Sequence, residues 1–283
     1  MAALPARRQN FTEKNEIAAL WCAAQRKARH FAWDGAIRDL SAIVSDHAGE
    51  FLLPDPLEKL RKADISRLPK VAGEPRVGPC VGSVGKFVCI GLNYSDHAKE
   101  AGMPVPVEPL VFMKPTSSIC GPNDDVVLPR GSTKGDWEVE LGVVVGKPGK
   151  YVKEADALSH VAGYCVIHDL SERAFQLEGT GQWVKGKSAD TFGPIGPSLV
   201  TPDEIPDAQN LDTWLEADGH RYQNGSTRTM IFGLPYLISY LSKFMSLQTG
   251  DVISTGTPPG VGFGLKPPVY LRAPRTAKPA CSS

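Results

Sequence analysis

Short apolar runs bounded by Gly, Pro or Asp recur along the chain from residue 87 onward. Runs of this length are typical of buried strands, because helices need longer periodic segments. They predict strands at Phe87–Gly91, Leu110–Met113, Val139–Val145, Val161–His168 and Val252–Ser254. No regular alternation of strands with helices joins them, which disfavours a Rossmann-type sheet. The pattern indicates a β-rich α+β fold.

Two further patterns predict a hairpin and a helix. Leu211–Asn224 is predicted to be a hairpin, because Asp218-Gly219 suits a two-residue turn. The helix is indicated by six apolar residues on one face of a 3.6-residue period, and Gly250 is expected to close the segment. This face, which suits core packing, consists of Leu234, Leu237, Ile238, Leu241, Phe244 and Met245.

The first eighty residues differ from the remainder. Residues 1–33 are a basic extension, atypical of the rest of the chain, in which Ile17–Arg29 is predicted to be an Ala-rich helix. Such a segment is typical of a mitochondrial transit peptide, and a loosely attached helical extension explains it equally well. Residues 34–80 are predicted to form a small N-terminal module, in which Asp55 is the N-cap of a helix. Residues 69–86 are predicted to be the linker into the main body.

Composition narrows the class of protein. The 283 residues include 28 Gly and 24 Pro, which favours many turns. Lys plus Arg equals Asp plus Glu at 31 each, so no net field attracts nucleic acid or a membrane surface. No apolar run approaches the roughly 18 residues of a membrane span. Six widely spaced cysteines predict reduced thiols in an intracellular protein.

Three carboxylates stand at strand ends. Glu138 and Glu140 lie two residues apart on a predicted strand, so both project to one face while Val139 points into the core. Two such carboxylates repel each other unless a proton or a cation lies between them. Asp169 follows the next long strand, and three oxygen ligands suit Mg²⁺ or Mn²⁺. A solvated strand face is the alternative.

A second candidate is a histidine beside a glutamate. The chain leaves a strand and enters a short helix, with Ser95 as its expected N-cap and Gly102 as its terminator. His97 and Glu100 are three residues apart and therefore share a helical face. A carboxylate beside an imidazole raises its basicity, as activation of water requires. The alternative is a surface pair of little consequence.

Cations and hydroxyls follow downstream. Arg173, Gln176, Lys185 and Lys187 are candidates to receive an anionic substrate or a developing enolate. For Lys185 a solvated basic loop is the favoured interpretation. The turn Ser254–Gly260 offers hydroxyls and backbone amides at a strand end, although it is equally explained as a tight turn.

Together and in this order, these elements resemble the fumarylacetoacetate hydrolase superfamily, which has a β-roll-like catalytic fold. The similarity runs from about Asp34 to Tyr270 and implies a catalytic domain at residues 81–270, between the N-terminal module and an atypical tail at 271–283 without strand character. It is carried by the stretches Gly91–His97, Phe112–Pro115, Glu138–Gly142 and Ser254–Pro258. The stretches Val166–Gln176 and Tyr222–Thr227 resemble the L-2,4-diketo-3-deoxyrhamnonate hydrolase type.

The resemblance assigns roles by position. It implies that Glu138, Glu140 and Asp169 bind Mg²⁺ or Mn²⁺, and that His97 and Glu100 activate water from a lid segment. It also implies that Lys187 stabilises or protonates the enolate, and that Arg173, Gln176 and Thr257 contact the substrate.

The activity implied is hydrolysis of the C–C bond of a 2,4-dioxo acid to pyruvate and a second acid such as lactate. The alternatives are an oxaloacetate decarboxylase or a hydroxymuconate-type isomerase on the same scaffold, and a truncated, non-catalytic relative. We expect a small keto acid as the partner, neither nucleic acid nor membrane, a homodimer and a cytoplasmic location, with mitochondria as the alternative if residues 1–33 are a transit peptide.

Overall fold

The central element is a five-stranded mixed sheet. The computed structural model describes residues 17–18, 29–31, 37–43, 48–272 and 277–282. The sheet has the order β5-β4-β15-β8-β9, in which β15 and β4 are parallel and the other neighbours antiparallel. Its strands confirm the apolar-run predictions, β5 being one residue longer. They are β4 (Phe87–Gly91), β5 (Leu110–Lys114), β8 (Val139–Val145), β9 (Val161–His168) and β15 (Val252–Ser254).

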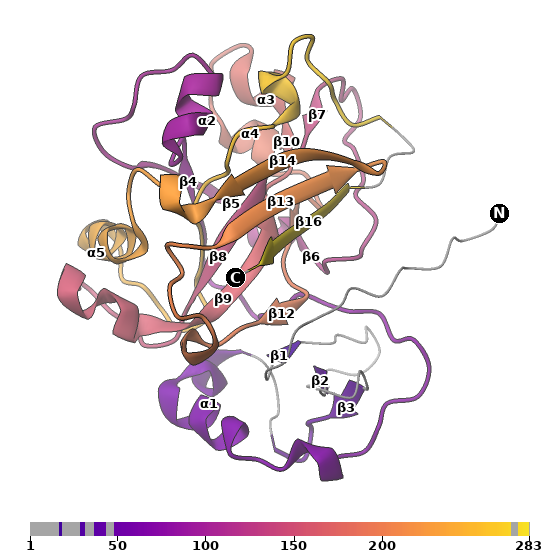
Figure 1. Cartoon of the computed structure of the whole chain (residues 1–283), viewed down its shortest axis with the longest axis vertical. Coiled ribbons are helices and arrows are strands. Elements are labelled where there is room, and N and C mark those ends of the chain that lie inside the picture. Colours follow the sequence, from indigo (N-terminus) through magenta and orange to yellow (C-terminus); the bar gives the residue numbers. More distant parts are fainter. Residues whose placement is uncertain (1–16, 19–28, 32–36, 44–47, 273–276, 283) are drawn as a thin grey trace.

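A three-stranded sheet packs across β8 and β9 (Figure 1). The predicted hairpin is confirmed as β13 (Asp212–Ala217) and β14 (His220–Ser226), with positive φ at both Asp218 and Gly219. The C-terminal residues were expected to lack strand character, and this is wrong: β16 (Ala277–Ser282) pairs with β13 along its length. Pairing to an open edge uses the backbone, so it does not require an apolar run.

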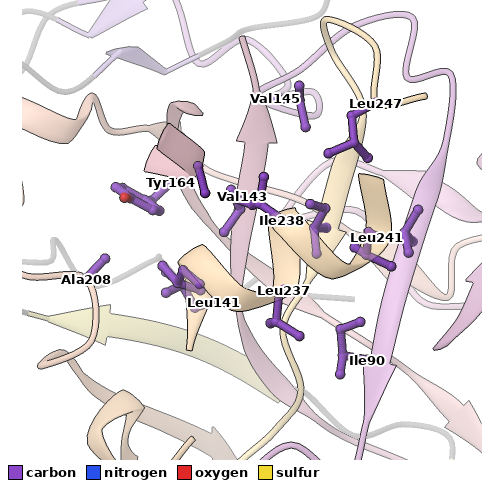
Figure 2. Close-up of a cluster of buried hydrophobic side chains, with 14 of the residues drawn as sticks. Ile90, Leu141, Val143, Val145, Tyr164, Ala208, Leu237, Ile238, Leu241 and Leu247 are labelled. Carbon is purple, nitrogen blue, oxygen red and sulfur yellow. The ribbon is translucent and has the colours of Figure 1, made fainter. Parts of the chain in front are cut away.

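The helix α5 (Leu234–Phe244) covers the other part of the core. Leu237, Ile238 and Leu241 pack towards β4 and β8, as Figure 2 shows. The prediction of core packing is wrong for Phe244, which is 62% exposed. Met245 already has extended backbone but packs against the same cluster as predicted. The helix ends at Phe244, so Gly250, farther along the chain, closes a later turn.

The N-terminal part lies below the main sheet in Figure 1. Its helix α1 (Pro54–Arg61) begins before the predicted cap: Leu53 is the N-cap, and Asp55 lies in the first turn. Pro54 explains the earlier start, since its fixed φ suits the first helical position. Leu57 and Leu60 join the cluster that also contains Phe87 and Val252 of the main sheet.

The prediction of an Ala-rich helix at Ile17–Arg29 is wrong at both ends of that range. Ile17–Ala18 form β1, which pairs with β12 (Ser198–Leu199), and β2 (Arg29–Phe31) pairs with β3 (Ile37–Asp39). Pairing with other strands overrides a weak local helix propensity. Residues 19–28 of that prediction lie outside the described residues.

Short elements complete the fold. The strand pairs are β6 (Ile119–Cys120) with β11 (Gly193–Pro194), and β7 (Gly135–Asp136) with β10 (Ser171–Glu172). The short helices are α2 (Ser95–Glu100), α3 (Arg173–Leu177) and α4 (Val184–Lys187), at the top of Figure 1. Short 3₁₀ helices lie at Gly49–Leu52, Ile65–Arg67, Thr116–Ser118, Glu154–His160, Pro202–Glu204, Thr227–Thr229 and Gly262–Gly264. Among the described residues, no helix is long and apolar enough to cross a membrane.

Candidate metal centre and active site

Three buried carboxylates meet where β8 begins and β9 ends. The antiparallel register pairs Val139 with His168, and the amide of Asp169 donates to the carbonyl of Glu138 at 2.9 Å. Side chains of Glu138, Glu140 and Asp169 therefore converge, and one oxygen of each lies within 4.8 Å of the others. All three are at least 95% buried. The structure thus brings together the three residues that were predicted from the sequence to be metal ligands.

Cationic side chains neutralise two of these carboxylates. The Lys187 ammonium bridges Glu138 and Asp169, with Nζ 2.6 Å from Oε2 and 2.7 Å from Oδ2. Arg173 donates to the other oxygen of Glu138 at 2.6 Å. Burial alone would raise the pKa of Glu138, but Lys187 and Arg173 outweigh it and hold this pKa below its usual value. Burial opposes the charged forms, but Asp169 and Glu138 raise the pKa of Lys187, and Asp136 and Glu138 raise the pKa of Arg173.

Glu140 has no such cationic partner among the described residues. Its Oε2 accepts hydrogen bonds from Ser254 Oγ at 2.5 Å and from the Gly256 amide at 2.9 Å. Burial, followed by repulsion from Asp169 and Glu138, raises the pKa of Glu140 to about 8. An oxygen-only donor set in which ionised Glu140 has no cationic partner among the described residues fits a divalent cation such as Mg²⁺ or Mn²⁺, which would favour loss of the Glu140 proton. These three residues would hold the ion.

The raised pKa predicts a pH dependence. In the metal-free protein, folded Glu140 keeps its proton up to pH about 8, whereas the unfolded chain releases it near the ordinary 4.5. The folded state then binds more protons, so this residue's contribution to the free energy of unfolding falls as the pH rises from about 5 to 8. Each unit of pKa difference corresponds to about 1.4 kcal/mol. Urea unfolding in EDTA at both pH values measures it.

Glu140→Gln is the matched control for this measurement, because Gln keeps the acceptor for Ser254 and Gly256 without the charge. We expect the stability of the variant relative to wild type to increase towards pH 8. A difference between the two proteins that is the same at pH 5 and pH 8 would contradict the assignment.

The histidine and glutamate of α2 form the expected pair. His97 Nδ1 lies 3.0 Å from Glu100 Oε2, and Glu100 Oε1 accepts a hydrogen bond from the Gly260 amide at 2.8 Å. Because Nδ1 faces Glu100, Nε2 is the ring nitrogen left for the pocket that His97 lines. The predicted cap is wrong: Tyr94 is the N-cap, and the Ser95 hydroxyl instead donates to the Thr229 carbonyl at 3.2 Å.

The predicted substrate side chains line the same pocket. Arg173 donates to Gln176 Oε1 at 2.9 Å, and both residues border the pocket with Thr257. The Thr257 hydroxyl donates to the Val139 carbonyl at 2.8 Å and accepts from Gln223 at 2.7 Å, which fixes its rotamer. Lys187 also lines the pocket. Lys185 does not: its exposed ammonium pairs with the Thr180 hydroxyl at 3.0 Å.

Two charged residues of the site had no role assigned from the sequence. The fully buried Lys114 donates to Asp169 Oδ1 at 2.7 Å and to the Leu170 carbonyl at 3.1 Å. Asp136 accepts from Arg173 Nε at 2.7 Å and from the Gly262 amide at 2.7 Å. Lys114 could have been identified from the sequence, because a lysine at the end of the apolar run of β5 is unusual. The partners of Asp136 are distant in sequence, so no local pattern could identify them.

Comparison with known proteins places this site in a family. The family model described as "Fumarylacetoacetate (FAA) hydrolase C-terminal" matches residues 86–278. The chain belongs to the fumarylacetoacetate hydrolase family. The resemblance noted in the sequence motifs is thereby confirmed at the family level, and the matched range contains the three carboxylates, the His97–Glu100 pair and Lys187.

Relatives agree on the fold and name several activities. The chain is 67% identical over 241 residues to a Burkholderia multivorans protein named only as a hydrolase, covering 85% of this chain and 86% of the relative. The structure of fumarylacetoacetate hydrolase from Exiguobacterium antarcticum is 30% identical with a TM-score of 0.80, covering 95% of each chain. That of 2-hydroxyhepta-2,4-diene-1,7-dioate isomerase from Mycobacterium marinum is 28% identical with a TM-score of 0.68, covering 91% of this chain and 94% of that one.

Proposed function

We propose that this fumarylacetoacetate hydrolase family member is a divalent-metal-dependent enzyme that hydrolyses the C3–C4 bond of a 2,4-dioxo acid. The products are pyruvate and a second carboxylic acid, and one water molecule is consumed. The observation that supports this best is the His97–Glu100 pair in the pocket that also contains Glu138, Glu140 and Asp169. A site with both elements suits a water nucleophile and an anionic leaving group.

The residues of the chain divide the chemistry between them. His97 Nε2 removes a proton from water, and Glu100 holds the imidazole by its Nδ1 and stabilises the imidazolium. The hydroxide adds to C4, and breakage of C3–C4 releases the acid and leaves the enolate of pyruvate. The Lys187 ammonium supports that negative charge or returns a proton to C3. A bound Mg²⁺ or Mn²⁺ would act as a Lewis acid on the keto acid.

The water-activating pair is also what favours hydrolysis over the alternatives. Decarboxylation of oxaloacetate and isomerisation of a hydroxymuconate-like diacid both need enolate stabilisation, but neither uses water as a nucleophile. A histidine oriented by Glu100, itself fixed by the Gly260 amide, is suited to take the proton from a nucleophilic water, a step that only the hydrolytic reaction contains. The bacterial origin of the relatives supports a cytoplasmic location within the same proposal. The homodimer stays a prediction.

We expect Mg²⁺- or Mn²⁺-dependent pyruvate release from 2,4-dioxohexanoate, abolished by EDTA and restored by added metal. The assay is run beside oxaloacetate and 2-hydroxyhepta-2,4-diene-1,7-dioate, and turnover of either of these without hydrolysis of the 2,4-dioxo acid would refute the proposal. If none of the three is turned over although Mn²⁺ raises the melting temperature, the chain is a non-catalytic relative.

A further inference from the structure

We propose that the pocket selects 2,4-dioxo acids whose acyl tail is neutral and apolar, through a lining built around Trp183, Phe112 and Phe263. This inference rests on the proposed hydrolase function and deepens it by naming the substrate class. Three kinds of acyl tail with different chemistry are compared: an alkyl or aryl group, a hydroxylated group as in a deoxy sugar acid, and a second carboxylate as in a dicarboxylic acid.

The lining changes from charged to apolar between the bottom of the pocket and its mouth. At the bottom, Glu138, Glu140 and Asp169 are almost completely buried. At the mouth, Met103, Leu177 and Phe263 are each about two-fifths exposed, at 45%, 41% and 42%. Exposed large apolar side chains gathered around an opening mark a surface that awaits an apolar partner. With a divalent cation held by these three carboxylates, the carboxylate end of a substrate belongs at the bottom, and its tail at the mouth.

An aromatic pair forms part of this lining. The rings of Phe112 and Trp183 pack edge to face, with centroids 5.6 Å apart, and the Lys187 ammonium lies 5.2 Å from the Phe112 centroid. Phe112 therefore lies next to both Trp183 and a cation of the charged bottom. From a distant part of the chain, Phe263 contributes a second aromatic surface, 6.0 Å from the Arg173 guanidinium.

The position of Trp183 depends on the absence of a side chain at residue 91. A Cβ atom added to Gly91 would lie 2.3 Å from Cζ3 and 2.8 Å from Cη2 of the indole. The ring thus lies directly over the backbone at the end of β4, in space that any other residue would occupy. This close approach fixes the indole in the lining of the pocket.

The cationic side chains of the pocket other than His97 are already engaged. Arg173 binds Asp136, Glu138 and Gln176, and Lys187 binds Glu138 and Asp169. Apart from His97 of the catalytic pair, no further cationic side chain is found among the described residues that line the pocket. A second carboxylate on the tail would therefore meet apolar side chains without a counter-ion, which is costly.

A hydroxylated tail meets the same difficulty. The Thr257 hydroxyl already donates to the Val139 carbonyl and accepts from Gln223. The pocket has a cavity volume of about 70 Å³, and a tail that points away from the buried carboxylates lies between Met103, Leu177 and Phe263 at the mouth. A hydroxyl there loses water without a replacement, whereas each methylene gains by leaving water.

The test compares tails that differ in one group. We expect kcat/KM to rise about fourfold for each methylene from 2,4-dioxohexanoate to 2,4-dioxooctanoate. It should fall at least about fivefold for 5-hydroxy-2,4-dioxohexanoate, and more for 2,4-dioxoheptane-1,7-dioate. Trp183→Ala and Phe263→Ala should each weaken this ranking. Phe244→Ala, which removes an exposed phenyl group outside the pocket, should keep it.

Binding of unreactive 2-oxo acids separates this inference from the proposed function. Calorimetry on the Mn²⁺-loaded protein should show tighter binding of 2-oxooctanoate than of pyruvate, and Phe263→Ala should reduce the difference even if Trp183→Ala fails to fold. Hydrolysis without tail preference, or with preference for the hydroxylated or dicarboxylic acid, would overturn the inference alone. Tail-selective binding without any hydrolysis would overturn the hydrolase proposal alone, and equal binding without hydrolysis would overturn both.

Discussion

Replacing Glu140 by Gln is expected to lower kcat/KM for 2,4-dioxohexanoate by about a thousandfold or more. Glu140 supplies the carboxylate charge that no cationic side chain balances among the described residues, so its removal eliminates most of the attraction for a divalent ion. Loss of Lewis-acid stabilisation costs several kcal/mol in the transition state, and each 1.4 kcal/mol is about a factor of ten in rate. Metal-dependent pyruvate release measures the effect.

A second readout shows that this loss comes from the metal site and not from misfolding. The rise in melting temperature that Mn²⁺ causes in the wild type should disappear in Glu140→Gln, while the metal-free variant should be at least as stable as the wild type at pH 8. Glu154→Gln, which changes an exposed glutamate outside the pocket, should leave turnover and the Mn²⁺ shift unaltered. Retention of both by Glu140→Gln would exclude this residue as a ligand.

Replacing His97 by Asn is expected to lower kcat by a factor of about 10² to 10⁴ while metal binding is retained. His97 pairs with Glu100 and contacts none of the three carboxylates through a hydrogen bond among the described residues, so its proposed task is proton transfer from water. A positioned general base contributes a rate factor of about this size. Steady-state hydrolysis of 2,4-dioxohexanoate measures it.

The control for this variant lies on the same helix. Lys99→Ala removes an exposed side chain two residues away and should leave hydrolysis and the Mn²⁺-induced melting shift close to wild type. The hydrolysis rate of Glu100→Gln should lie between those of His97→Asn and Lys99→Ala. In this variant the imidazole keeps a hydrogen-bond acceptor but loses the charge that stabilises the imidazolium. If His97→Asn abolished the Mn²⁺ shift as well, its role would be to organise the metal site and not to activate water.

Local sequence patterns predicted the structure correctly where it depends on a single strand, turn or helix. Every strand of the main sheet follows from a short apolar run, and Asp218-Gly219 marks the hairpin of the second sheet because positive φ is favoured there. The spacing of Glu138 and Glu140 places both on one side of the chain, since side chains alternate along a strand. His97 and Glu100 meet because residues three apart share a helical face.

Local sequence patterns did not predict the structure where two segments distant in the chain must meet. Ala277–Ser282 and Ile17–Ala18 are strands only because β13 and β12 offer backbone partners, and the composition of neither segment predicts this. Likewise, the close approach of Trp183 to Gly91 depends on where the chain returns, which periodicity does not encode.

The sequence by itself determined the family, the candidate ligands and the candidate base of this protein. The tertiary structure decided which charges compensate one another. It places Lys187 between Glu138 and Asp169, brings Lys114 to Asp169 from another strand, and leaves Glu140 without a cation among the described residues. The physical reason is that electrostatic energy depends on distance in space and on burial, and the order of residues along the chain specifies neither.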